Sequence, residues 1–166
     1  MSVDQTLGVK QRETVSETEL RDTLKAAGLR ITQPRIAALK VLHRGGHLSV
    51  ERLLTEVQRS VQNTSFQTMY GVLEALCTAG LARKIELGRG LPALFEANHN
   101  DNHHHTVCQV CGYVEDTPCD TQLSPCVHLP ANSDFAIDTA EVTFYGVCGS
   151  CQREAAIHAP KPTKAL

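Results

Sequence analysis

The chain has 166 residues, of which 42% are hydrophobic and 20% are charged, a composition typical of one globular domain or two small ones. No apolar run approaches the ~20 residues that a membrane helix needs. The first ten residues lack the basic head and apolar core of a secretory signal. We therefore expect a cytoplasmic protein without a membrane partner.

The distribution of charge and the number of cysteines indicate which ligands each half of the chain could bind. Residues 1–90 carry 13 Lys and Arg against 9 Asp and Glu, a net charge of +4, and residues 91–166 carry 3 against 9, a net charge of −6. This division predicts two domains, the first suited to nucleic acid and the second to cations. Seven cysteines in a reducing compartment indicate metal binding or redox chemistry before disulfides.

Four amphipathic helices are predicted after a loose polar arm over residues 1–15. Ser16 with Glu19 forms a capping box, Gln33-Pro34 suits a first helical turn, and Ser49 and Ser65 are N-cap residues. Glycine follows the first, second and fourth helices, where it favours termination. The apolar residues on which these helices are predicted, listed helix by helix, are Leu20, Leu24 and Ala27; Ile36, Leu39 and Leu42; Leu53, Leu54 and Val57; and Phe66, Met69, Val72, Leu73 and Leu76.

A hairpin is predicted next, with strands over Leu81–Leu87 and Leu91–Glu96 around a glycine-containing turn. Pro92 makes the second strand an edge strand. Helices followed by a small hairpin have the element order of a winged helix-turn-helix unit, although other small α+β domains share that order. We expect this domain to span residues 16–97 and a polar hinge to span residues 98–102.

The second half is predicted to be a small, loop-rich domain over residues 103–159. Short strands are expected at His104–Cys108, Tyr113–Asp116 and Phe135–Tyr145, the last with a bulge, and a final helix at Gln152–His158. Residues 117–134 indicate an irregular loop, and residues 160–166 a disordered tail. The expected fold class is therefore α+β: a winged helix-turn-helix domain followed by a small α/β domain held by zinc.

Two CxxC pairs, Cys108 with Cys111 and Cys148 with Cys151, predict that zinc site. Each pair supplies two thiolates at the spacing that tetrahedral Zn²⁺ needs, and a metal would stabilise a domain with a weak core. Reduced unligated thiols or a disulfide are the alternatives. A thioredoxin-like site requires a βαβ pattern and a zinc deaminase requires a His-x-Glu motif, and the sequence has neither.

Three consecutive histidines precede the first pair. Alternation along a strand places His103 and His105 on one face and His104 on the other. With Glu96, Asp101 and Asp116 nearby in sequence, they predict a mixed imidazole and carboxylate site suited to Fe(II), Zn(II), Ni(II) or Mn(II). The alternative is a solvated linker with incidental histidines.

Four segments carry a resemblance to a known family: Gly28-Leu-Arg-Ile-Thr-Gln-Pro-Arg35, Thr68-Met-Tyr-Gly-Val-Leu73, Asp101-Asn-His-His-His-Thr-Val-Cys-Gln-Val-Cys-Gly112 and Tyr145-Gly-Val-Cys-Gly-Ser-Cys151. With them the sequence resembles the ferric uptake regulator (Fur) family of metal-dependent repressors over about residues 18–152. Its Asn-His-His-His run, its extra cysteines Cys119 and Cys126, and its Ala-Glu-Val run are most similar to the actinobacterial FurA branch, which is associated with iron- and redox-responsive control of catalase-peroxidase genes.

The resemblance implies a homodimer in which the second domain is the dimerisation domain. It matches the four CxxC cysteines to the family's structural zinc site. It also implies a regulatory site for one divalent metal, Fe(II) first and Mn(II), Zn(II) or Ni(II) otherwise. The residues that match the ligands of this regulatory site are His47, Glu96, His103, His105 and Asp116.

The resemblance further implies binding to double-stranded DNA with an A/T-rich inverted repeat. The start of the fourth helix would meet base edges, with Tyr70 against a thymine methyl group, and two arginines would meet phosphates or a narrow minor groove. Gly71 stands where the family usually has Arg. The expected DNA-binding residues are Arg30, Arg35, Ser65, Gln67, Thr68 and Tyr70.

Other departures from the family pattern refine the expected function. Asn102 and Ala140 replace imidazoles of the family's second peripheral site, so that site is not expected here. Asp116 occupies a position where the family's peroxide sensors carry Asp and its iron sensors often carry Glu, which favours peroxide sensing through iron-driven oxidation of a ligand histidine. The expected signal is Fe(II), peroxide or both. Cys119 and Cys126 fit a redox pair or two loop thiols.

The leading hypothesis is therefore a repressor, without enzymatic activity, of iron-homeostasis or catalase-peroxidase genes. A zinc- or nickel-sensing repressor of the same family is the first alternative. A zinc-binding redox enzyme and a zinc-stapled interaction module, both without a DNA role, are alternatives of other classes.

Overall fold

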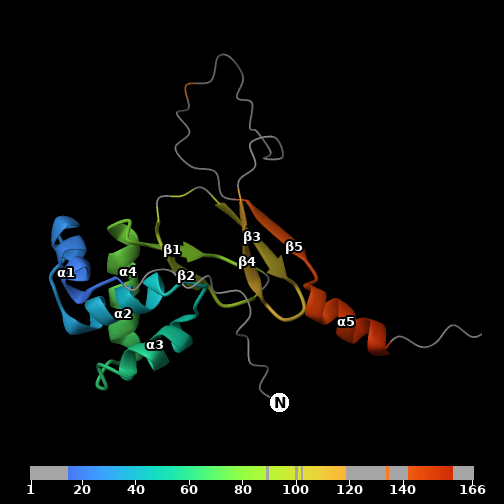
Figure 1. The fold of residues 1–166 in the computed structure, drawn as a ribbon, viewed down its shortest axis with the longest axis horizontal. Coiled ribbons are helices and arrows are strands. Elements are labelled where there is room, and N and C mark those ends of the chain that lie inside the picture. The colour runs from blue at the N-terminus through green and yellow to red at the C-terminus, as the bar shows by residue number, and fades with distance from the viewer. Residues whose placement is uncertain are drawn as a thin grey trace, which may run out of the picture. The chain divides into compact units, whose positions relative to one another are not determined.

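The structure is a computed structural model that describes residues 15–88, 90–99, 101, 103–118, 134 and 142–158. These residues form five helices and five strands, divided between two compact units, residues 1–101 and residues 102–166 (Figure 1). The predictions for the arm before residue 15, for Cys119 and Cys126, for nearly all of the loop after Pro118, for residues 135–141 and for the tail lie outside the described residues.

Helix α1 (Glu17–Ala26) begins with the predicted capping box. The Ser16 side chain accepts a bond from the Glu19 N–H (3.2 Å), and the Ser16 N–H donates to the Glu19 carboxylate (2.7 Å). The helix ends at Gly28, whose φ of 70° allows the Leu29 N–H to reach the Leu24 carbonyl (2.9 Å). Both local predictions for this helix are confirmed.

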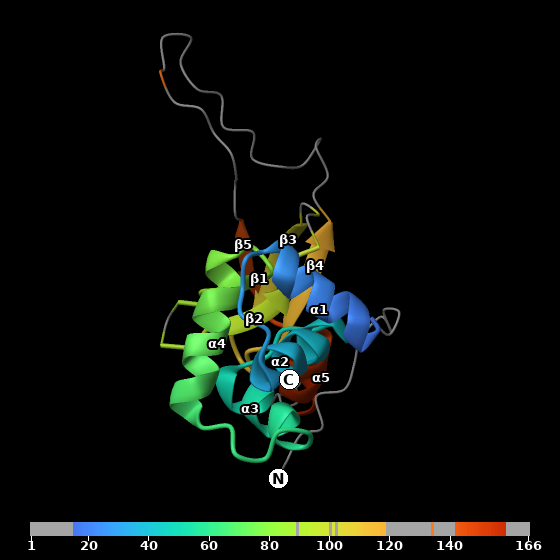
Figure 2. The same cartoon turned by 90° about the vertical axis from the view of Figure 1, so that its left-hand side faces the viewer.

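Helix α2 (Gln33–His43) is the centre of the first unit, because it packs against α1, α3, α4 and β2. Helix α3 (Val50–Gln58) begins at Ser49, whose hydroxyl accepts from the Arg52 N–H (3.4 Å). Helix α4 (Phe66–Thr78) begins in the same way at Ser65, and Figure 2 shows it along one side of the helical group. The core of this unit contains Leu20, Leu24, Ile36, Leu39, Leu42, Leu53, Val57, Met69, Leu73 and Leu76.

One apolar residue of α4 lies outside the core. Phe66 has 45% of its surface exposed, whereas Met69 and Leu76 are fully buried. A helical Cα–Cβ bond tilts toward the helix N-terminus, so a side chain in the first position overhangs the start of the helix instead of covering the core.

A two-stranded antiparallel sheet of β1 (Ala82–Ile85) and β2 (Leu94–Ala97) completes the first unit as the wing. Both strands are shorter than predicted. The Leu91 N–H donates to the Gly88 carbonyl (3.0 Å), which closes the turn at Leu91, and β2 begins only at Leu94. The prediction that Pro92 lies in the second strand is therefore wrong, because the proline precedes that strand.

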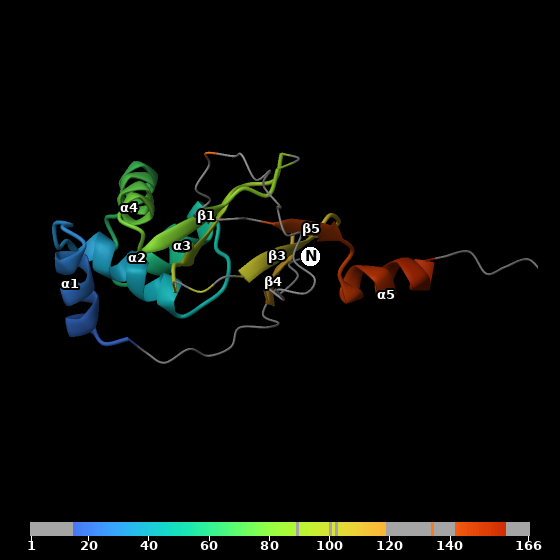
Figure 3. The same ribbon diagram turned by 90° about the horizontal axis from the view of Figure 1, so that it is seen from above.

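The second unit is a three-stranded sheet in the order β4-β3-β5, followed by α5 (Gly149–His158) (Figure 3). Strand β3 (His103–Cys108) pairs antiparallel with β4 (Val114–Pro118) and parallel with β5 (Thr143–Gly146). Helix α5 begins before the predicted Gln152, since the second CxxC pair forms its first turn. In the described part of the chain, no helix is both long and apolar enough to cross a membrane.

Candidate metal centres and nucleic-acid interface

The first CxxC pair is held by a tight turn at the end of β3. Cys108 is the last residue of the strand, and its N–H donates to the Tyr113 carbonyl (2.8 Å). The Gly112 N–H returns to the Cys108 carbonyl (2.9 Å), with a φ of 72° at this glycine. Such a left-handed turn directs Cys108 and Cys111 toward the same side.

The second CxxC pair follows β5 and opens α5. The Gln152 N–H donates to the Cys148 carbonyl (3.0 Å), which makes Cys148 to Cys151 a helical turn. The Gln109 N–H of the first turn donates to the Gly146 carbonyl at the end of β5 (2.8 Å). Parallel strand pairing and this backbone bond therefore bring together two turns that are 37 positions apart in sequence.

The four sulfurs are arranged as zinc ligands. Cys108, Cys111, Cys148 and Cys151 each offer a sulfur, and all four lie within 4.8 Å of one another. The Sγ atoms of Cys111 and Cys148 are 3.7 Å apart. Zn–S bonds of ~2.3 Å in a tetrahedron place two sulfurs about 3.8 Å apart, whereas a disulfide requires about 2.05 Å. The donor set therefore fits a tetrahedral Zn²⁺ and does not fit a Cys111–Cys148 disulfide.

The electrostatics of the cluster agree with a site for a cation. Burial raises the pKa of the Cys108 thiol, but backbone N–H groups of Cys148, Cys111 and Val110 bond to its sulfur and lower that pKa to about 6. Hydrogen bonding to the Cys148 thiol raises the pKa of Cys151, and burial raises the pKa of Cys111. A bound cation would favour the thiolate forms of Cys111 and Cys151 against these raised pKa values.

The second unit also contains a cluster of imidazole and carboxylate groups. The rings of His103 and His105 lie on one face of β3 with centroids 5.0 Å apart, and His103 Nε2 is 3.9 Å from Asp116 Oδ1. Asp116 on β4 is the register partner of His105. His104 is buried on the other face against the Phe144 ring, with centroids 6.2 Å apart. The predicted alternation along this strand is confirmed.

The first unit holds the other two predicted ligands together. The Leu48–Phe95 bridge, with backbone bonds of 3.0 Å and 2.8 Å, joins the loop before α3 to β2. It sets His47 Nε2 3.4 Å from the carboxylate of Glu96. Residue reasoning alone missed His47, because this pairing is not local in sequence, and only the family resemblance indicated it.

Glu96 also lies beside a fixed cation. Arg83 is its register partner on β1, and the Arg83 guanidinium is 4.0 Å from Glu96 Oε1 and 4.0 Å from Asp101 Oδ1. The same guanidinium donates to the Asp101 carbonyl (2.7 Å). Glu96 therefore contacts both the His47 imidazole and the Arg83 guanidinium, and Asp101 is also paired with Arg83.

The predicted DNA-binding residues lie at the start of α4, in the loop before α2 and in the first turn of α2. Ser65, Gln67, Thr68 and Tyr70 are exposed at the start of α4. The hydroxyls of Ser65 and Thr68 bond to each other (2.9 Å). No acidic residue occupies the first turn of α4, unlike those of α1 and α3. This helix end is therefore open to an anion.

Arg30 and Arg35 are joined by a hydrogen bond, since Arg35 Nη1 donates to the Arg30 carbonyl (2.8 Å). This bond orients the Arg35 guanidinium toward the loop that precedes α2. Both arginines therefore lie on the same short segment of the first unit.

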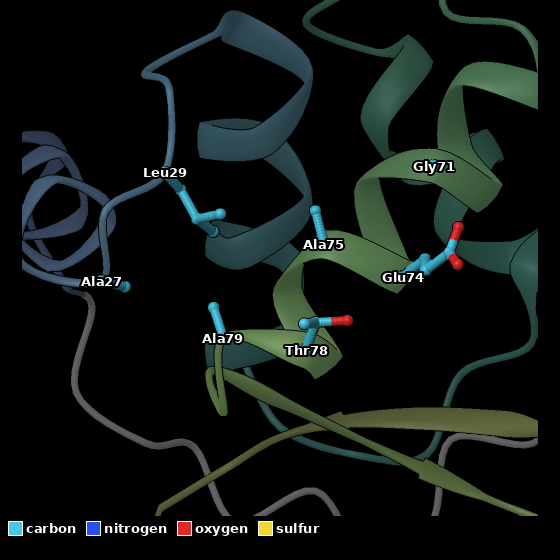
Figure 4. A pocket seen from close by; sticks show the side chains of 7 residues that line it. All are labelled: Ala27, Leu29, Gly71, Glu74, Ala75, Thr78 and Ala79. Atoms are coloured by element: carbon cyan, nitrogen blue, oxygen red, sulfur yellow. The ribbon is translucent and has the colours of Figure 1, made fainter.

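An open groove of about 460 Å³ lies between α4 and the turn after α1 (Figure 4). Its lining is mostly small or apolar and contains a single ionisable side chain, that of Glu74. It has no cysteine or histidine, so it is not a metal centre. The lining residues are Ala27, Leu29, Gly71, Glu74, Ala75, Thr78 and Ala79.

Comparison with known proteins agrees with this arrangement. The profile described as the ferric uptake regulator family matches residues 26–145. The transcriptional regulator FurA of Mycobacterium tuberculosis is 38% identical over 130 residues, which cover 78% of this chain and 88% of the relative. The solved structure of the Vibrio cholerae ferric uptake regulator Fur is 28% identical, covers 77% of this chain and 98% of its own, and has a TM-score of 0.65.

A further solved structure, the peroxide stress regulator of Campylobacter jejuni, is 25% identical with a TM-score of 0.63, and covers 81% of this chain and 97% of its own. The shared fold identifies unit one as the winged helix-turn-helix DNA-binding domain and unit two as the dimerisation domain. Regulators of this family bind DNA and act as dimers. The chain therefore belongs to the ferric uptake regulator family, and it is a metal-dependent DNA-binding repressor rather than an enzyme.

Proposed function

We propose that this repressor is a cytoplasmic homodimer that binds an A/T-rich inverted repeat when a regulatory divalent ion, Fe(II) in the cell, is bound. The observation that carries the proposal is the division of the ligands between the two units. His47 and Glu96 lie together in the first unit, and His103, His105 and Asp116 lie together in the second. Neither set alone completes the coordination of such an ion.

A mixed nitrogen and oxygen donor set suits Fe(II), and a bound ion supplies the bonds that join the two sets. Imidazole and carboxylate ligands from both units would restrict the angle between the units. A dimer reads two half-sites only when its recognition helices are separated by ~34–36 Å or a multiple of it. Restricting that angle would therefore raise DNA affinity, with a coupling of ~1–3 kcal/mol.

The cysteine cluster has a different role in this proposal. A four-thiolate site binds Zn²⁺ tightly and leaves no open coordination position. Its ligands all come from one unit, so occupancy stabilises the sheet and α5 without changing the angle between units. We assign zinc there as a permanent structural ion.

On DNA, Gln67 and Tyr70 would contact base edges, with Tyr70 against a thymine methyl group. Ser65 and Thr68 chiefly fix the start of α4, because their hydroxyls cap the helix and bond to each other. Arg30 and Arg35 would contact phosphates or a narrow minor groove. The absence of an acid in the first turn of α4 supports this placement.

Peroxide response is a second candidate function, favoured by Asp116 in the ligand set. A peroxide stress regulator is also among the structures similar to this chain. Zinc or nickel sensing uses nearly the same ligands, so the metal has to be identified by titration. The target genes proposed are those of iron homeostasis or catalase-peroxidase.

The deciding experiment measures DNA binding by fluorescence anisotropy, with the zinc-loaded dimer and a duplex selected by the protein from a random library. Four ions are titrated separately: Mn(II) as a redox-stable substitute for Fe(II), Fe(II) itself under anaerobic conditions, Zn(II) and Ni(II). We expect His103→Ala to lose the metal-stimulated increase and to keep the fold. The matched control is His43→Ala, which removes an imidazole of the first unit that contacts the His99 ring (5.6 Å) instead.

Equal DNA affinity before and after complete chelation of the exchangeable ion would refute the regulatory site. Loss of DNA binding in the chelated protein together with an unaffected His103→Ala variant would place the regulatory ligands elsewhere.

A further inference from the structure

Phe66 is a large apolar side chain that the fold does not use for its core. It is the first residue of α4, and 45% of its surface is exposed. At 100° per residue, Phe66 lies about 85° from the centre of the buried face that Met69, Val72 and Leu76 define, and Tyr70 lies about 125° from it. Phe66 and Tyr70 therefore lie on the same side of the helix, beside its buried face.

The rings of Phe66 and Tyr70 form a single apolar ridge on that side of the helix. Their centroids are 6.3 Å apart with the planes inclined by 34°, as expected for an i, i+4 aromatic pair. Tyr70 is 54% exposed. Among the described residues of the first unit, the exposed large hydrophobic residues are Phe66, Tyr70 and Ile31. Two of these three side chains thus lie in the first turns of one helix.

The polar side chains around Phe66 and Tyr70 indicate which DNA groups these two rings could recognise. The hydroxyls of Ser65 and Thr68 bond to each other in the helix cap, so among the exposed side chains of residues 65–68 that of Gln67 has the most capacity left for hydrogen bonding to bases. A phenyl ring cannot read a hydrogen-bond donor or acceptor. The apolar group that the major groove of DNA offers is the C5-methyl group of thymine.

We propose that Phe66 is a specificity-determining residue that contacts a thymine methyl group within two base-pair steps of the one contacted by Tyr70. The ring separation of 6.3 Å is close to two base-pair steps of DNA, about 6.8 Å. The pair therefore selects half-sites with two thymines no more than two steps apart. This inference rests on the proposed placement of the first turn of α4 in the major groove.

The test removes the methyl group and the ring separately. The zinc-loaded dimer with Mn(II) is titrated with a duplex that it selects from a random library, and with duplexes in which one thymine at a time is replaced by deoxyuridine. Wild type, Phe66→Ala, Tyr70→Ala and Thr78→Ala are compared, the last as a control at the far end of α4. Thermal unfolding checks that each variant is folded; Phe66 is exposed, so its truncation costs little stability.

We expect one thymine position at which deoxyuridine weakens binding by wild type about four-fold, the value of one buried methyl group. Phe66→Ala should bind the unmodified duplex more weakly and lose the penalty at that position only. Tyr70→Ala should lose the penalty at a second position within two base-pair steps, and Thr78→Ala should behave as wild type.

The inference is overturned if Phe66→Ala keeps every deoxyuridine penalty of wild type while Tyr70→Ala loses one. If neither variant alters DNA affinity, the placement of α4 in the groove fails as well, so the two failures can be told apart. A general loss of affinity in Phe66→Ala with all penalties unchanged would assign the ring a structural role and also refute the inference.

Discussion

Replacing Gly71 by alanine should stabilise the first unit, although Gly71 lies within the proposed DNA-binding helix. The residue is exposed in the interior of α4, and its φ is not in the left-handed region. A Cβ added there meets no atom within 4 Å. The substitution therefore gains the full helix-propensity difference between glycine and alanine, about 0.8–1.0 kcal/mol, without a steric cost.

Gly28 provides a matched control, because a Cβ added at this position also meets no atom within 4 Å. The difference is its φ of 70°, which an L-residue adopts at a cost of roughly 1–2 kcal/mol. Gly28→Ala should therefore destabilise the unit. The same chemical change at two open positions is predicted to have opposite signs, decided only by backbone conformation.

Thermal and urea unfolding of both variants in the zinc-loaded protein measure the effect. For a unit of this size, Gly71→Ala should raise the midpoint of the first unit by roughly 4–8 °C, and Gly28→Ala should lower it by at least that much. Shifts in the same direction for the two variants would refute the reasoning, since they would show that space or solvation, and not φ, decides the outcome.

Three further outcomes are expected. Gly71→Arg should raise DNA affinity for all sequences and steepen the dependence of log K on log salt by about one unit per new phosphate contact, measured by anisotropy. Cys108→Ser should lose its zinc in metal analysis and lower the unfolding midpoint of the second unit, whereas Cys77→Ser, in a helix of the first unit, should retain the zinc; a folded, zinc-free Cys108→Ser dimer would contradict structural zinc. Hydrogen bonds from Ser16 hold the pKa of Glu19 below its usual 4.5, so the carboxylate stabilises α1 above pH 4.5 and this contribution is lost as the pH falls further. Unfolding of Glu19→Gln compared with wild type across that range should show the difference shrinking with acid, and a constant difference would count against the capping box.

The helix starts could be predicted from sequence because each depends on residues close together in the chain. The thiolate site could be predicted because paired cysteines at this spacing are characteristic zinc ligands. Ser16, Ser49 and Ser65 each cap a helix through a residue three positions away. The four cysteines need only a suitable ligand spacing, and their side chains meet although the pairs are far apart in sequence.

Features that depend on distant contacts or on helix ends could not be predicted in this way. His47 approaches Glu96 through the pairing of Leu48 with Phe95, which no periodicity reveals. Phe66 has helical spacing to core residues but lies where no preceding turn covers it. Helix α5 starts early because a CxxC turn is itself helical, which a composition pattern cannot show.

The parallel pairing of β3 with β5 has a consequence for the order in which the repressor matures on the ribosome. The first unit has all its strands and helices by residue 101, so it can fold while the rest is still being synthesised. The second unit is completed later, because β3 meets β5 only after residue 146 has been synthesised and the set of four thiolates is complete only at Cys151. A nascent chain can therefore have a folded DNA-binding domain long before it can bind zinc or form a dimer. A partly folded repressor exists only between the folding of the first unit and the completion of the second.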